Sequence, residues 1–353
     1  MKTIRERICS VGLPDEKAGM EARAHWDAIA KPLGSLGQFE EMIIQIAALR
    51  GNAVFCLKKR VLTVFCADNG VTAQGVSQCG SVVTARVAAA LAEGKSTANR
   101  MACQVNCRVI PVDVGILDFP GHPNVRRMRV RNGTGDISRE PAMTREECLK
   151  AMEYGAALAE ELSQKGTDLL AVGEMGIGNT TTATALAAAM LGLEPDEITG
   201  RGAGLSSEGL VRKRAAIRQA LARQTCSSND TTGLMAELGG LDIAAMCGAF
   251  IGAAECRLPV IIDGVISEVA ALCAMRLCPA VKSAMLPSHL SAEPVARLLQ
   301  DAMGIHAPID ANLHLGEGTG ALMLMPMLDA AMAVYQSGES FRELGIEAYQ
   351  PWI

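Results

Sequence analysis

A Gly-rich turn that carries a carboxylate is the first place in the sequence where chemistry could occur. Residues 173–182 read G-E-M-G-I-G-N-T-T-T and follow the apolar run Leu169–Val172. Main-chain amides in such a turn, with the positive end of a helix dipole starting at Asn179, bind phosphate groups. Glu174 places a carboxylate in the same turn. Tight packing of the strand on the helix explains the glycines equally well, because the segment matches neither a Walker loop nor G-x-G-x-x-G.

A second Gly-rich turn, residues 200–204, precedes a helical pattern that contains Lys213. No pair of adjacent acidic residues follows an apolar strand, as a site that holds pyrophosphate through magnesium would need. We therefore predict a monophosphate ligand and no obligatory metal or cofactor. The residues predicted to hold its phosphate and ribose are Gly176, Asn179, Thr180, Gly202, Gly204 and Lys213.

A second carboxylate lies between glycines near the end of the chain. Residues 315–321 read L-G-E-G-T-G-A and place Glu317 before the apolar helical stretch Leu322–Val334. The neighbouring glycines would let a ligand approach this carboxylate closely. Partial desolvation would make it a suitable general base near neutral pH. A Glu that interacts with free amides at a helix N-terminus explains the same pattern, and spacing alone does not decide between the two.

Five short apolar runs, each followed by a polar or Gly-containing turn, must position these groups. Because the runs are apolar throughout, they suit strands of a parallel sheet buried on both faces. Polar side chains that follow such strands collect beyond their carboxyl ends, where ligands of open α/β sheets bind. We predict an α/β fold with a doubly wound, mainly parallel sheet and helices on both faces. The runs are Val61–Cys66, Val109–Val112, Leu169–Val172, Val260–Ile262 and Ala284–Leu286.

The segments between the runs are Ala-rich and read as helices. Residues 51–300 are predicted to form a large nucleotide-binding catalytic domain. Residues 1–50 and 301–353 read as helices without strands and are predicted to pair as a smaller domain that contributes Glu317. The Arg-rich segment 118–142 is interpreted as a solvated loop or hairpin, with a phosphate clamp as the alternative. The predicted helices are Ser81–Met101, Thr144–Ser163, Asn179–Leu193, Ser207–Arg223 and Leu241–Ala254.

Composition excludes several classes of protein. The 353 residues are 49% apolar and carry a net charge of -5, which provides no broad basic face for nucleic acid or anionic lipid. The 12 cysteines contain no C-x-x-C pair, which favours reduced thiols in a cytoplasmic protein over disulfides or zinc. No apolar run reaches the ~18 residues that span a bilayer, and the N-terminus does not read as a signal peptide.

Several motifs, taken together, resemble the nicotinate-nucleotide–dimethylbenzimidazole phosphoribosyltransferases, which activate the lower-ligand base of cobalamin. They occur in family order from about residue 30 to about residue 335, and their number and order make the resemblance specific. The matching stretches are Lys31–Gly37 with Glu40, Ala67–Gly70, Asp113–Gly115, Gly173–Gly176 with Asn179–Thr181, Gly239–Asp242, Asp263–Gly264, Ser288–Ser291 with Glu293, and Leu315–Gly320.

The resemblance implies transfer of phosphoribose from nicotinate mononucleotide to a ring nitrogen of an aromatic base. The products are an α-ribotide for cobamide nucleotide-loop assembly and nicotinate. In that family the Glu of L-G-E-G is the catalytic base, which assigns this role to Glu317, with Glu174 assisting. The chemistry agrees, since a pyridinium leaving group needs no protonation and the main task is to remove the acceptor proton. A homodimer, or a heterodimer with a homologous subunit, is expected.

The sequence departs from the family where the acceptor should lie. Asn69 stands where the family commonly has His, Cys79 and Gly80 where it often has an aromatic residue and Pro, Val87 where it has Gln, and Val265 where it often has Phe. We therefore predict an altered acceptor, with phenols or other azoles as candidates besides dimethylbenzimidazole. The predicted acceptor pocket comprises Asp68, Cys79, Gly80, Val87, Met175, Asp263, Ser291 and Leu315.

Two alternative functions compete with this interpretation. The first is a non-catalytic or regulatory homologous subunit that binds nucleotide without turnover, against which the retained Glu317 argues. The second is another nucleotide-dependent α/β enzyme such as a dehydrogenase, which the absence of a dinucleotide fingerprint after any strand disfavours.

Overall fold

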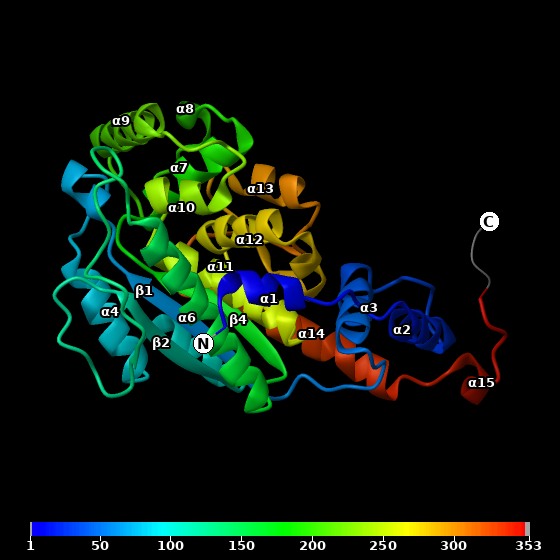
Figure 1. Ribbon diagram of the computed structural model, residues 1–353. Helices are drawn as coiled ribbons and strands as arrows, with labels where there is room; N and C mark the ends of the chain where they lie inside the picture. The colour runs from blue at the N-terminus through cyan, green and yellow to red at the C-terminus, as the bar shows by residue number, and fades with distance from the viewer. Residues whose placement is uncertain (1, 350–353) are drawn as a thin grey trace.

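Six parallel strands form the central sheet of the computed structural model, which describes residues 2–349 (Figure 1). Residue 1 and residues 350–353, the two ends of the predicted smaller domain, lie outside the described residues. The strand order is β3-β2-β1-β4-β5-β6, and all neighbours pair in parallel. The strands are β1 (Arg60–Ala67), β2 (Cys107–Gly115), β3 (Arg126–Arg127), β4 (Leu169–Met175), β5 (Val260–Ile262) and β6 (Met285–Pro287).

The strand order reverses next to β1. From β1 the chain moves outward to β2 and β3, then returns to β4 on the other side of β1, and β5 and β6 continue from there. Sheets with this reversal bind ligands beyond the carboxyl ends of the strands at the reversal. The predicted doubly wound sheet is confirmed, and its ligand-binding edge lies after Ala67 of β1 and Met175 of β4.

Side chains along β1 alternate between two apolar cores. Val61 and Phe65 pack into one core, and Leu62 and Val64 pack into the other. Both faces of the sheet are thus covered by helices, which explains why the strands have no polar alternation. The helices of the first core include α6 (Arg145–Gln164), α7 (Asn179–Leu191), α10 (Thr231–Leu238), α11 (Leu241–Glu255) and α12 (Val265–Leu277), and those of the second include α4 (Val82–Ala92), α5 (Thr97–Gln104) and α14 (Thr319–Ser337).

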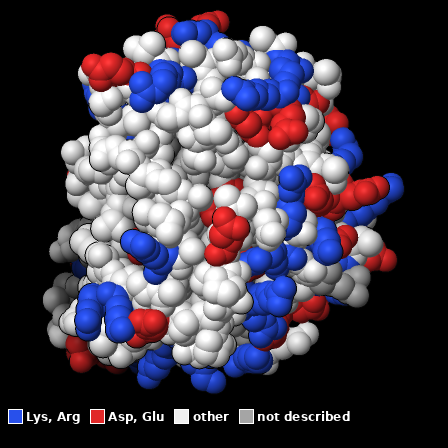
Figure 2. Space-filling view, turned by 90° about the vertical axis from the view of Figure 1, so that its left-hand side faces the viewer, with Lys and Arg blue, Asp and Glu red and all other residues white. Residues whose placement is uncertain are grey.

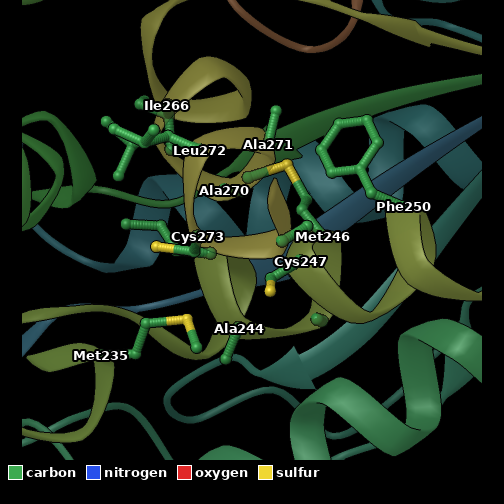
Figure 3. Packing of buried hydrophobic residues seen from close by; sticks show 14 of the residues in the cluster. Met235, Ala244, Met246, Cys247, Phe250, Ile266, Ala270, Ala271, Leu272 and Cys273 are labelled. Atoms are coloured by element: carbon green, nitrogen blue, oxygen red, sulfur yellow. The ribbon is translucent and has the colours of Figure 1, made fainter. Parts of the chain in front are cut away.

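Helix α11 lies in the first core and is buried around its whole circumference. Its side chains meet those of α12 in a cluster rich in sulfur, where Met246 and Cys247 lie near Cys273 (Figure 3). All 12 cysteines are free thiols. Burial raises the pKa of the Cys148 thiol to about 12. The buried thiols therefore stay protonated and pack as small apolar groups.

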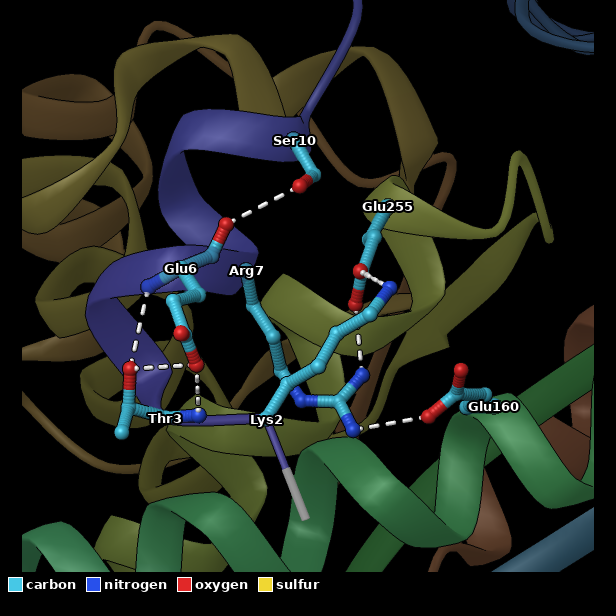
Figure 4. A network of polar contacts seen from close by, with 7 residues as sticks. All are labelled: Lys2, Thr3, Glu6, Arg7, Ser10, Glu160 and Glu255. Atoms are coloured by element: carbon cyan, nitrogen blue, oxygen red, sulfur yellow. Dashed lines mark hydrogen bonds and ion pairs between the residues drawn. The ribbon is translucent and has the colours of Figure 1, made fainter.

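Helix α1 (Ile4–Ser10) is attached to the large region of the molecule by one buried arginine. Arg7 donates to Glu160 of α6 at 2.7 Å and to Glu255 of α11 at 2.5 Å (Figure 4). The division of the chain at residues 50 and 300 remains a prediction, and α1 packs on the larger region. Helices α2 (Glu16–Ala28), α3 (Gln38–Arg50), α15 (Phe341–Leu344) and the end of α14 lie at the right of Figure 1.

Two elements differ from prediction. Only helices were predicted after residue 300, but strand β8 (Ile309–Leu313) pairs in parallel with β7 (His289–Ser291). The middle of β8 is exposed, so it lacks the apolar run that indicates a buried strand. The predicted helix Ser81–Met101 is two helices, because Gly94 is left-handed and Ser96 caps a new helix.

The Arg-rich segment 118–142 contains the edge strand β3 rather than a hairpin. Arg129 pairs with Asp113 at 2.7 Å, and Arg131 pairs with Glu147 at 3.2 Å. These carboxylates already neutralise the two guanidinium groups, which favours the solvated loop over the phosphate clamp. The remaining elements are α8 (Pro195–Ile198), α9 (Ser207–Arg223), α13 (Ala296–Met303) and the 3₁₀ helices η1 (Gly70–Gln74) and η2 (Pro279–Ala284).

Between residues 2 and 349, no helix combines the length and the apolar character that crossing a membrane requires. The face drawn in Figure 2 carries Lys and Arg side chains intermixed with Asp and Glu, together with a broad uncharged area. This face therefore presents no continuous basic surface of the kind that nucleic acids bind.

We predict that Gly155→Ala destabilises the protein by about 1–3 kcal/mol, because overpacking a tight core contact costs this much. A Cβ at Gly155 of α6 would lie 1.8 Å from the main-chain oxygen of Ala245 of α11, so the two helices would have to separate. Gly19→Ala is the matched control, since its Cβ would lie 3.3 Å from the Cβ of Ala48. Urea denaturation measures both, and equal stability of the two variants would contradict the prediction.

Candidate active site

A cavity of about 310 Å³ opens beyond the carboxyl ends of the strands, at the reversal of the sheet. Its walls come from the turns after β4 and β5, from the start of α4, from β7 and from the segment before α14. The structure thus brings together side chains that are far apart in the sequence. The predicted site residues that line the cavity are Cys79, Val87, Glu174, Met175, Gly176, Asn179, Thr180, Gly202, Asp263, Ser291, Leu315 and Glu317.

Glu317 lies in a left-handed turn at the entrance to α14. Its φ of 58° follows 84° at Gly316 and precedes 76° at Gly318, so the chain turns sharply and aims the carboxylate into the cavity. Oε2 of Glu317 is buried and has no hydrogen-bond partner within residues 2–349. Burial, and to a lesser degree the charge of Asp263, raises the pKa of Glu317. A carboxylate in this state accepts a proton more readily than an exposed one.

Asp263 holds this turn in place. Its Oδ2 accepts from the amide of Gly318 at 3.0 Å, and its Oδ1 accepts from the amide of Ala321 at 3.1 Å. Both oxygens thus satisfy free amides at the start of α14. Asp263 lines the cavity, as predicted, but its carboxylate supports the turn that carries Glu317.

Gly173 of β4 allows the Glu317 turn to lie against the sheet. A Cβ at this position would lie 2.3 Å from the amide nitrogen of Gly318. The glycine is therefore required by close approach of two main chains, the strand β4 and the turn before α14, rather than by packing on the helix that follows the strand.

Glu174 forms a buried polar cluster with Asn179 and Asp242. The amide of Asn179 donates to both carboxyl groups, to Asp242 at 2.9 Å. Burial, followed by the charge of Asp242, raises the pKa of Glu174 to about 8. Burial also raises the pKa of Asp242 to about 6. Glu174 therefore tends to be protonated at neutral pH, and a protonated carboxyl group can donate a hydrogen bond to a ligand.

Lys213 lies behind the cavity wall rather than in it. Its Nζ is 3.0 Å from both Oγ1 of Thr180 and the main-chain oxygen of Gly200, and its side chain is 1% exposed. Burial lowers its pKa to about 8, against the opposing charge of Glu293. No carboxylate of the described chain forms an ion pair with it. A buried ammonium with only neutral partners favours an anionic ligand nearby.

Four predicted residues do not line the cavity: Lys213, Gly204, Gly80 and Asp68. Asp68, predicted in the acceptor pocket, instead accepts from the Thr84 hydroxyl at 2.6 Å and the Leu117 amide at 2.8 Å. Asp68 thus joins the end of β1 to α4 and to the segment that follows β2. Gly80 and Gly204 have positions beside the wall, next to Cys79 and Ala203, which do line it.

His289 lines the cavity. The scattered spacing of the histidines in the sequence indicates ordinary polar or capping residues instead. Nδ1 of His289 lies 3.0 Å from Oγ of Ser288, and burial lowers its pKa, so the imidazole favours its neutral form. Its place directly after β6 in a parallel sheet is the signal that could have identified it. The other unpredicted lining residues are Val83, Ile177, Ala203, Gly264, Val265, Ile266, Ser267, Glu293, His314 and Gly316.

We predict that Asp263→Asn destabilises the protein by about 1–3 kcal/mol, the cost of leaving a buried amide without its acceptor. The NH₂ group replaces one of two accepting oxygens, so the amide of Gly318 or Ala321 loses its partner. Asp15→Asn is the control. One carboxylate oxygen of Asp15 accepts a hydrogen bond from the amide of Ala18, and an Asn side chain keeps one oxygen that can accept it. Denaturation should separate the variants, and a similar loss in both would refute this account.

Comparison with known proteins identifies the family of this chain. The family described as "Phosphoribosyltransferase" matches residues 11–346. The nicotinate-nucleotide–dimethylbenzimidazole phosphoribosyltransferase of Acetivibrio thermocellus is 40% identical over 327 residues, which cover 93% of each chain. That of Ruminiclostridium cellulolyticum is 39% identical over 349 residues, 99% of each chain. The crystal structure of CobT from Thermus thermophilus superposes with a TM-score of 0.89 at 38% identity, covering 94% of this chain and 99% of that one. The chain therefore belongs to the nicotinate-nucleotide–dimethylbenzimidazole phosphoribosyltransferase family.

Proposed function

We propose that this chain transfers phosphoribose from nicotinate mononucleotide to an aromatic acceptor in the cavity and releases nicotinate. The observation that carries the proposal is the carboxylate of Glu317, which enters the cavity with one buried oxygen unpartnered in the described chain. The Gly-rich turns at 176 and 202 and the buried ammonium of Lys213 support a phosphate site beside it.

The reaction then needs little from the protein beyond a base and alignment. The acceptor nitrogen or oxygen attacks C1′ of the ribose, and the C1′–N bond to the pyridinium breaks. The electron pair of that bond neutralises the pyridinium nitrogen, so nicotinate leaves without protonation. Glu317 takes the acceptor proton. Glu174, protonated, is placed to donate a hydrogen bond to the bound substrate.

The alternative of a non-catalytic homologous subunit is less well supported, because such a subunit has no need of a desolvated base.

A dimer is part of the proposal. Leu315, Met323 and Met327 are 54%, 43% and 40% exposed around the start of α14, and Met323 and Met327 share one helix face. Exposed apolar side chains of this kind suit a subunit contact. The cytoplasmic location remains a prediction.

Glu317→Gln should lower kcat by about 10²- to 10⁴-fold, the usual cost of losing a general base. The binding of nicotinate mononucleotide should change little, because the amide keeps the shape of the side chain. Glu347→Gln on the surface is the control. Steady-state kinetics with calorimetry tests both statements, and wild-type kcat in the variant would remove Glu317 from the mechanism.

Lys213→Met should raise KM for nicotinate mononucleotide, since the variant fills the space without the charge. Nicotinate riboside, which lacks the phosphate, should be used equally poorly by wild type and variant. This pairing isolates the interaction between Lys213 and phosphate. Exposed Lys150→Met is the control. Added EDTA should leave the wild-type rate unchanged, and an equal loss with both substrates would assign Lys213 a structural role only.

The acceptor side of the cavity is lined mainly by aliphatic and sulfur-containing side chains, among them Cys79, Val83, Val87 and Ile266. An apolar wall separates acceptors of similar shape weakly, by about 10²-fold or less. We therefore expect comparable kcat/KM for dimethylbenzimidazole, other azoles and phenols.

Incubation of the protein with nicotinate mononucleotide and a panel of benzimidazoles, purines and phenols, with products identified by mass, tests the function. Val87→Gln should shift preference toward benzimidazoles, with Val211→Gln on the exposed face of α9 as control. Absence of any ribotide would contradict the function. A preference for dimethylbenzimidazole of several orders of magnitude would contradict the broad acceptor range.

A further inference from the structure

A buried carboxyl group with no part in the proposed reaction lies directly behind the cavity. Glu268 is in the first turn of α12, next to Gly264–Ser267, which line the cavity. It is 1% exposed. Oε1 accepts from Nε2 of Gln300 at 2.7 Å, whereas Oε2 is buried without any partner in residues 2–349. A carboxylate with this environment is costly unless it carries a proton.

Gln300 connects Glu268 to two further segments. It is fully buried on α13, and its Nε2 also donates to the main-chain oxygen of His289 at 3.3 Å. Its Oε1 accepts from the amide of Ala307 at 3.1 Å. One side chain thus joins α12, β7 and the segment that enters β8.

The joined segments form one wall of the cavity. Strand β7 carries His289 and Ser291, and β8 leads directly to the turn of Glu317. Glu293, just after β7, accepts from the amide of Gly202 at 2.9 Å and so connects this wall to the proposed phosphate turn. A shift of β7 would therefore move the Gly-rich turn at Gly202, where the phosphate is proposed to bind.

We propose that Glu268 and Gln300 are a positioning pair that holds β7 and the Gly-rich turn in the geometry that binds nicotinate mononucleotide, and that ionisation of Glu268 loosens this wall because it leaves an unpaired charge at the buried Oε2. The inference rests on the proposed use of this cavity for that nucleotide. Neither residue lines the cavity, so neither is expected to contact the substrate.

The buried position of Glu268 favours its protonated form. Burial, together with the charge of Asp263 at the end of β5, raises its pKa to about 8. Helix α12 also packs against elements that carry Glu174, Asp242, Glu255, Lys282, Arg297 and Asp301, as well as Glu237 of α10 and its own Arg276, and none of these described groups pairs with Glu268. His289, the titratable group on β7, shares only the Gln300 amide through its main chain.

The first test follows stability against pH. The pKa of Glu268 is higher in the folded chain than the usual 4.5, so its favourable contribution is complete below pH 4.5 and is lost as the pH rises to about 8. Glu268→Gln keeps the bond from Gln300 and cannot ionise. The Tm of this variant relative to wild type should therefore rise steadily between pH 5 and 8 and level off above. A constant difference would show that Glu268 is ionised throughout and would overturn the proposal.

The second test measures the Kd of nicotinate mononucleotide by calorimetry at pH 6.5 and pH 9. Wild type and Glu268→Gln should bind alike at the lower pH, and wild type should bind several-fold more weakly than the variant at the higher pH. The comparison cancels titration of Lys213 and Glu174, which both proteins share. Equal Kd values at pH 9 would overturn the proposal. No binding by wild type at either pH would instead refute the proposed function.

Gln300→Leu supplies an independent variant. It removes the bonds to Glu268, His289 and Ala307 and should weaken nucleotide binding by about tenfold, which one to two lost hydrogen bonds amount to. The kcat of the variant should fall by a smaller factor than its affinity for the nucleotide. Gln45→Leu is the matched control. The side-chain amide of Gln45 on α3 also donates to main-chain oxygens, among them that of Met285 at 2.8 Å, but its acceptor lies in β6 rather than β7. Equal effects on Kd in the two variants would contradict the assignment.

Discussion

The contact on which the candidate site depends is the pair of hydrogen bonds from the start of α14 to Asp263. These two bonds join the turn that carries Glu317 to the residue that directly follows β5. The neighbouring main chains are so close that β4 needs Gly173, because a Cβ there would overlap Gly318. The position of Glu317 is thus determined by the carboxylate of Asp263 after β5 and by the amides at the start of α14, rather than by contacts of its own carboxylate.

Burial of charge sets the chemistry of the cavity. Glu174, Asp242 and Glu268 lie in or near its walls, and burial raises the pKa of each. Lys213 is a buried cation behind the same walls, and burial lowers its pKa. Both trends reduce the charge carried by the residues of the site. An arriving phosphate would favour the charged form of Lys213, so binding of nucleotide and uptake of a proton are expected to be linked.

The sheet and the two carboxylate turns could be predicted from sequence because uninterrupted apolar runs and glycines leave a local signal. Strand β8 could not, since its exposed middle residues resemble a loop. Asp68 was predicted in the acceptor pocket but does not line the cavity, because a position after a strand does not specify the direction of a side chain, and its oxygens accept from Thr84 and Leu117. Lys213 was identified, but its place behind Thr180 depends on packing between α7 and α9 that no local pattern encodes.

The turn before α14 also has a consequence for the synthesis of the protein chain itself. Gly318 lies so close to β1 that a Cβ there would overlap the Leu62 side chain, so the turn fits against the strands that it follows in the chain. A growing chain leaves the ribosome with the six strands of the central sheet ahead of this turn. The proposed catalytic base is therefore synthesised after all the strands of the sheet that position it.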